Sequence, residues 1–177
     1  EGGVRWDPKV VGCVEASVAT GAAEGAWGAF QAEMRALPLT LVHGDFHPAN
    51  LMVSGEPPRL VMLDFEQVGV GSGPQDLAQF MISHAAPSDR RAEERGAVRG
   101  YHAALCALAP AATAAWGYTE EEAFEEYVRG GVGRWAWFLP VLEGMLPAKV
   151  TQYFHDQFRA FVEDHGVTPE TMPMPRV

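Results

Sequence analysis

Cysteine, basic residues and long apolar runs are all scarce in this sequence. Two cysteines among 177 residues, Cys13 and Cys106, cannot build a disulfide framework or a cysteine-based zinc site. They are typical of reduced thiols in a cytoplasmic protein. No apolar run reaches the roughly 18 residues of a membrane-spanning helix. Lys and Arg total 13 against 23 Asp and Glu, a formal net charge of −10, which argues against nucleic acid and anionic membranes as partners.

The remaining composition is that of a globular protein of about one domain. Apolar residues make up 47% of the chain, which is ordinary for such proteins. Between residues 22 and 37, the spacing of Trp27, Phe30, Met34 and Leu37 predicts a helix with one buried face. Further helices are expected over residues 9–20, 91–108, 119–129 and 150–165, with a break at Gly130 to Gly133 and an interruption at Pro140.

A single β-hairpin is expected in the first half of the chain. The segments 51–53 and 59–65 are rich in β-forming residues, and a Gly- and Pro-containing turn separates them. Asn50 stands at the start of this hairpin and Asp64 near its end. Because a hairpin returns the chain to its starting point, these two side chains are expected to lie close together.

The most informative pattern is His43-Gly44-Asp45, followed by Asn50 and then by Asp64-Phe65-Glu66. The spacing from Asp45 to Asn50 equals that between the catalytic aspartate and the asparagine of the protein-kinase signature, whose later motif also begins Asp-Phe. Phosphoryl transfer would explain these residue types. Mg²⁺ on a nucleotide prefers hard oxygen ligands, such as Asn50 and Asp64. Asp45 would accept the proton of the attacking hydroxyl and orient it.

The segment from Leu41 to Met52, together with Leu63-Asp64-Phe65-Glu66, resembles the aminoglycoside phosphotransferase and choline kinase-like superfamily. The later Gly73-Pro74-Gln75-Asp76-Leu77-Ala78 is similar to the Gly-x-Pro-x-x-Asp-Leu-Ala element of that superfamily. The combination is most similar to the ecdysteroid kinase-like group. The resemblance implies an ATP- and Mg²⁺-dependent kinase that acts on a hydroxyl group of a small molecule.

The resemblance also implies a role for each matching residue. Asp45 would be the catalytic base, and Asn50 and Asp64 would be the Mg²⁺ ligands. His47 stands where protein kinases place a lysine that meets the γ-phosphate, so it could donate a hydrogen bond to the nucleotide. Glu66 is left without a role.

Two further residues would support the loop. His43 matches a structural histidine that braces the loop by hydrogen bonds rather than reacting. Asp76 matches an acid that caps the next helix and is tied back to the catalytic loop.

The implied fold is the large, C-terminal lobe of a protein kinase-like fold: mainly α, with a small β-hairpin. Residues 1–167 would form this lobe, with a catalytic loop (43–50), a metal-binding hairpin (51–66) and a helical subdomain (76–166), and residues 168–177 a flexible tail. Only 42 residues precede His43, too few for the small lobe that binds ATP, and neither Lys9 nor Lys149 suits the phosphate-binding lysine of that lobe. We therefore expect the N-terminal lobe to be missing, truncated or supplied elsewhere.

Other interpretations stay open on the sequence alone. A lobe without its nucleotide-binding partner could be a non-catalytic binding or scaffold module. His43-x-Asp45-x-His47 could belong to the metal cluster of a hydrolase, although the other histidines form no recognisable ligand pattern. The acidic run from Glu120 to Glu126 is expected to be a solvated helix face, with a docking site for a cationic substrate as the alternative.

Overall fold

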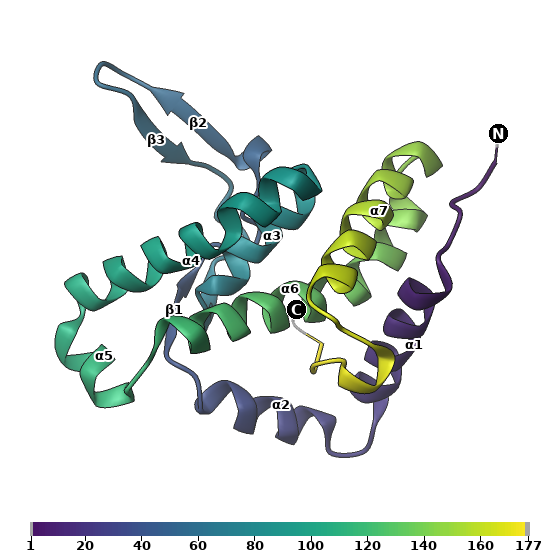
Figure 1. Cartoon of the computed structure of the whole chain (residues 1–177), viewed down its shortest axis with the longest axis horizontal. Coiled ribbons are helices and arrows are strands. Elements are labelled where there is room, and N and C mark those ends of the chain that lie inside the picture. The colour runs from purple at the N-terminus through teal and green to yellow at the C-terminus, as the bar shows by residue number, and fades with distance from the viewer. Residues whose placement is uncertain (1, 176–177) are drawn as a thin grey trace.

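The computed structural model describes residues 2–175, and helices dominate this part of the chain. In chain order the elements are α1 (Pro8–Ala22), α2 (Ala26–Arg35), β1 (Leu39–Val42), η1 (Pro48–Asn50), β2 (Leu51–Ser54), β3 (Arg59–Met62), β4 (Gly69–Ser72), α3 (Pro74–His84), α4 (Pro87–Leu108), α5 (Pro110–Trp116), α6 (Glu120–Met145), α7 (Ala148–Asp164) and η2 (Pro169–Thr171) (Figure 1). The prediction of a mainly helical chain with a small hairpin is confirmed. Among the described residues, no helix has both the length and the apolar character needed to span a bilayer.

Two antiparallel strand pairs frame the segment that carries the predicted site. The expected hairpin is formed by β2 and β3, with Leu51 opposite Met62, and it projects from the helical body (Figure 1). A second pair joins β1 to β4, with Val42 opposite Gly69, and sequence analysis did not predict it. This antiparallel register sets Gly69 beside Val42, where the predicted catalytic loop begins, and α3 starts two residues after β4.

The core lies among α1, α3, α4, α6 and α7. Its largest fully buried side chains include Trp135 and Tyr127 from α6 and Phe158 and Phe161 from α7. The long helix α6 begins with a capping box, in which Thr119 and Glu122 satisfy each other's backbone N–H groups. It runs through the middle of the molecule, and α3 packs across it (Figure 1).

The expected break at Gly130 to Gly133 and the interruption at Pro140 are wrong, because α6 continues through both. The glycines serve close packing instead. A Cβ atom on Gly130 would lie 3.0 Å from the Cβ atom of Gln75, and one on Gly131 would lie 2.9 Å from the Cβ atom of Ala78. The missing side chains therefore let α3 approach α6, and this tertiary contact outweighs the poor helix propensity of glycine.

Replacing Gly131 by Ala is expected to destabilise the protein by about 1–3 kcal/mol, because the added methyl group overpacks the contact between α3 and α6. Gly96→Ala is the matched control, since a Cβ atom on Gly96 in α4 meets nothing within 4 Å. There, removal of a helical glycine should stabilise by up to about 1 kcal/mol. Urea unfolding of both variants measures the two effects. Equal shifts of the same sign would contradict the packing role of Gly131.

The predicted buried face of the helix over residues 22–37 is also wrong. The helix α2 begins only at Ala26, after Gly25 with a φ of 79°, and none of its residues is buried. Trp27 is 69% exposed and stacks on Phe30, with ring centroids 5.5 Å apart. The regularly spaced side chains Trp27 and Phe30 thus contact each other on neighbouring turns of the helix instead of packing into the core.

The end of the chain packs against the helical body. Gly166, with a φ of 63°, follows the last turn of α7. Residues 168–175, expected to belong to a flexible tail, include η2, in which Pro169 lies close to Gly12 of α1. Met172 packs against the core. Residues 176–177 of the expected tail lie outside the described residues.

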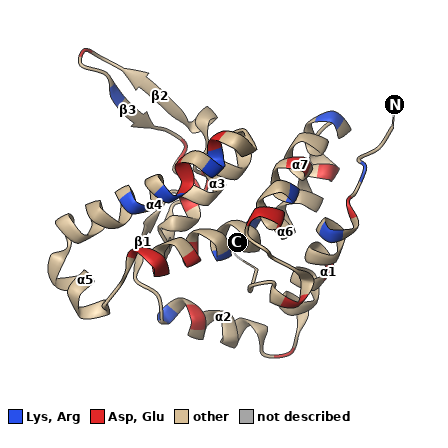
Figure 2. Cartoon of the chain, in the orientation of Figure 1, with Lys and Arg blue, Asp and Glu red and all other residues tan. Residues whose placement is uncertain are grey.

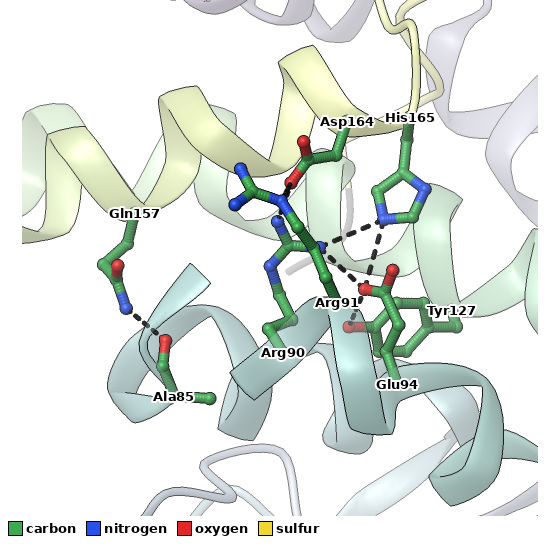
Figure 3. Close-up of polar contacts among 8 residues, drawn as sticks. All are labelled: Ala85, Arg90, Arg91, Glu94, Tyr127, Gln157, Asp164 and His165. Carbon is green, nitrogen blue, oxygen red and sulfur yellow. Dashed lines mark hydrogen bonds and ion pairs between the residues drawn. The ribbon is translucent and has the colours of Figure 1, made fainter. Parts of the chain in front are cut away.

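A buried ionic network joins α4 to the C-terminal end of α7 (Figure 3). Arg90, only 1% exposed, donates to Glu94 at 2.7 Å and forms an ion pair with Asp164. Tyr127 of α6 and His165 also contact the Glu94 carboxylate, at 3.0 and 3.3 Å. Burial by itself would raise the pKa of Glu94, but hydrogen bonds from His165 and Arg90 outweigh burial and hold that pKa below its usual value.

Candidate active site

Asp45 lies in the loop after β1, and its half-buried carboxylate has partners on both oxygens. Gln79 donates its side-chain Nε2 to Oδ1 at 2.8 Å. Oδ2 lies 3.2 Å from Nδ2 of Asn50 and 3.3 Å from Nε2 of His47. The carboxylate is therefore held in one orientation by groups from the loop and from α3.

Asn50, at the end of η1, is buried and fixed by its amide nitrogen. Nδ2 donates to the backbone oxygen of Asp45 at 3.0 Å and to Oδ2 of the same residue. The backbone N–H of Asn50 donates to the His47 carbonyl at 2.9 Å, which closes the short helical turn. Neither side-chain bond uses Oδ1, the atom with which an asparagine binds a metal ion.

The hairpin brings Asp64 back toward Asn50, as its sequence position suggests. Leu63 donates its backbone N–H to the Asn50 carbonyl at 2.9 Å, and Asp64 is the next residue. Asp64 has a φ of 60°, in the left-handed region that aspartate adopts more readily than most residues. Its side chain is exposed, unlike those of Asp45 and Asn50.

His43 connects the loop to the end of the hairpin. Its Nε2 donates to the Leu63 carbonyl at 2.8 Å, and its Nδ1 accepts the backbone N–H of Asp45 at 3.3 Å. These two bonds require the neutral ring with its proton on Nε2. The ring also lies against Phe65, with centroids 4.9 Å apart.

Asp76, in the first turn of α3, binds the backbone at the start of the loop. Its carboxylate accepts the backbone N–H groups of His43 at 2.7 Å and Gly44 at 3.1 Å. Burial raises the pKa of Asp76, and the two backbone hydrogen bonds offset only part of that rise. Gly44 has a φ of 80°, and a Cβ atom there would lie 2.3 Å from the carbonyl oxygen of Gln67, so the turn requires glycine.

His47, expected to meet a phosphate, lies beside the Asp45 carboxylate. Its ring stacks on that of His84, with centroids 5.9 Å apart and planes at 14°. Partial burial and the neighbouring His47 lower the pKa of His84. In the described part of the chain, Nδ1 of His47 is buried without a hydrogen-bond partner.

Sequence reasoning missed two residues of this site. Gln79 follows Asp76 by three residues, so helical periodicity alone would place both on the same face of α3. Arg134 comes from α6, distant in sequence, and no motif marks it. Burial lowers the pKa of Arg134, and the charges of Asp45 and Asp76 oppose this shift.

Two of the alternatives from the sequence concern the histidines of the loop and the acidic run at the start of α6. Within residues 2–175, no three His, Cys, Asp or Glu side chains are grouped so that they could hold a metal ion, so a hydrolase-type cluster around His43, Asp45 and His47 is not formed. Part of the acidic run at the start of α6 is paired on the surface, with Glu120 bound to Arg99 and Glu121 to Arg95.

Comparison with known proteins identifies a family. The model of the phosphotransferase enzyme family (APH) matches residues 11–124. No curated protein and no solved structure matches the chain significantly. The matched range covers more than half of the chain and includes the loop, both strand pairs and α3. The chain therefore belongs to the phosphotransferase enzyme family.

Proposed function

We propose that this protein transfers the γ-phosphate of ATP to a hydroxyl group of a small molecule, as a kinase of the ecdysteroid kinase-like group. The family supports phosphotransferase activity. The observation that supports the finer proposal is the fixed carboxylate of Asp45, which accepts a hydrogen bond from Gln79. Asn50 is bonded to Asp45, and the hairpin brings Leu63, the residue before Asp64, to the backbone of Asn50. This arrangement supports a site in which one base and two oxygen ligands act around a single loop.

In this proposal Asp45 is the catalytic base. It accepts the proton of the acceptor hydroxyl and aims that hydroxyl at the phosphorus atom. Phosphoryl transfer passes through a loose transition state, so orientation contributes more than base strength. The fixed orientation of the Asp45 carboxylate suits such a role.

Asn50 and Asp64 would hold Mg²⁺, and the residues present fit this ion. Mg²⁺ takes one or two protein oxygens and completes its shell with phosphate oxygens and water. The bonds from Nδ2 to Asp45 fix the Asn50 amide while leaving Oδ1 out of both. When bound, Mg²⁺ neutralises the charge of the nucleotide phosphates. His47, beside Asp45, would donate to a phosphate oxygen.

A second lobe that binds the nucleotide is part of the proposal. Large apolar side chains are exposed on both strand pairs beside the loop, including Leu41 (76%), Val70 (73%) and Val53 (72%). Few charged residues interrupt the hairpin (Figure 2). A cavity of about 400 Å³, lined by residues such as Phe46 and Phe65, opens next to His43 and Asp76. The small lobe of the enzyme, with its phosphate-binding lysine, would cover this surface and complete the large lobe formed by the present chain.

We also place the enzyme in the cytoplasm, with neither nucleic acid nor membrane as a partner. Cys13 and Cys106 are both free thiols, which suits a reducing compartment. The formal net charge of −10 disfavours binding to phosphate backbones and anionic lipids.

A screen of small hydroxyl compounds with the full-length protein, ATP labelled in its γ-phosphate and Mg²⁺ tests the proposal. Transfer of label to an acceptor, lost on addition of EDTA, is the expected result. Asp64→Asn should abolish the transfer, whereas Asp89→Asn, at an exposed aspartate of α4, should leave the transfer and its loss with EDTA unchanged. Ligand binding without any transfer would favour the non-catalytic module instead.

A further inference from the structure

We propose that Gln79 is a positioning residue for the catalytic base, an inference that rests on the proposed function. Its side chain is 3% exposed, and its Nε2 lies 2.8 Å from Oδ1 of Asp45. In the described part of the chain, this is the hydrogen bond that ties the carboxylate to an α-helix.

The other two partners of the carboxylate come from its own loop. Asn50 and His47 both follow Asp45 within five residues, so their bonds to the carboxylate do not by themselves connect it to another element. Gln79 instead belongs to α3. Its bond therefore fixes the rotation of the carboxylate relative to the helical body.

The helix α3 contacts the loop with one face and the core with the other. Asp76 and Gln79, three residues apart, face the loop and hold its first residues and its base. Ala78 and Ile82, four residues apart, are buried in the core, where both pack against Gly131 of α6. One face of α3 is thus anchored to the core while the other orients the reactive carboxylate.

Kinetics of Gln79→Leu test this role. The variant keeps the volume of the side chain but removes the donor, so kcat should fall by about 10- to 100-fold while KM for ATP stays within about twofold. Ser83→Ala is the matched control. Ser83 is equally buried, one turn further along α3, and bonds only to the Phe80 carbonyl within the described residues. Its kcat should stay near that of the unchanged protein.

A double-mutant cycle separates positioning from general support of the fold. If Gln79 acts through Asp45, then Gln79→Leu should cost no further activity in an Asp45→Asn background. Gln79→His, which offers a ring nitrogen at a similar distance from the backbone, should restore part of kcat. Additive losses in the cycle, or a kcat for Gln79→Leu within about twofold of the unchanged protein, would overturn the proposal.

The contact between Gln79 and Asp45 can also be tested without measuring activity. The side-chain amide protons of Gln79 can be followed by NMR in the 177-residue chain. Their resonances should shift strongly in Asp45→Ala and very little in Asp89→Asn. Unchanged resonances in Asp45→Ala would refute the contact whether or not transfer occurs. Absence of transfer to every acceptor, with the shift present, would count against the kinase activity and with it the positioning role, while the contact itself would stand.

Discussion

Replacement of Asp45 by Asn in the full-length protein should lower kcat for phosphoryl transfer by about 10²- to 10⁴-fold. An asparagine keeps the shape of the side chain but cannot accept the proton of the attacking hydroxyl. It also points N–H groups at one of the donors that surround the carboxylate, Gln79 or Asn50. Steady-state kinetics with the acceptor identified by the screen measure the loss, and KM for ATP should change little.

Thermal unfolding of the same variant serves as the control for Asp45→Asn. A preserved melting temperature with a large loss of kcat would assign the effect to chemistry rather than to folding. Undiminished transfer by a folded Asp45→Asn protein would exclude Asp45 as the base and, with it, the proposed arrangement of the site.

Arg90→Met is expected to reduce the free energy of unfolding by about 3–5 kcal/mol, the largest stability effect that we predict. The side chain of Arg90 is almost completely buried, and its removal leaves the carboxylates of Glu94 and Asp164 without their shared cation. Methionine has a similar length, so lost packing contributes less than the uncompensated charge. Urea unfolding at neutral pH measures the change.

The neighbouring Arg91 provides the matched control for this network. Arg91 also binds Asp164, at 2.8 Å, but its side chain is half exposed. Arg91→Gln should therefore cost only about 0–1 kcal/mol, as exposed ion pairs do. If both variants lost the same small amount, burial of Arg90 would not be the source of its stabilisation.

The sequence was sufficient for the parts of the fold that local chemistry determines. The hairpin could be predicted because β-forming segments flank a turn rich in Gly and Pro, and the kinase-like motif around Asp45 and Asn50 is compact in sequence. By contrast, Gly69 to Ser72 forms β4 only because β1 lies beside it. No local propensity favours a strand there.

Long-range packing explains the other differences. The glycines of α6 appear as a helix break in sequence, and only the close approach of Gln75 and Ala78 explains why they remain helical. The apolar spacing of α2 indicates a buried face, yet its rings stack on each other. Within the site, Gln79 could have been inferred from its helical spacing to Asp76. Arg134 could not, because α6 reaches the site through tertiary structure alone.

The two carboxylates of the proposed site differ in how strongly the structure around them is held to the core. Asp45 is tied through α3 to the core, whereas Asp64 follows a hairpin on which only Leu51 is partly shielded from water. Segments with few buried apolar contacts open at lower free energy than the core. A substitution in the helical body should therefore disturb Asp45 more than Asp64, whereas a molecule bound to the hairpin should disturb Asp64 more.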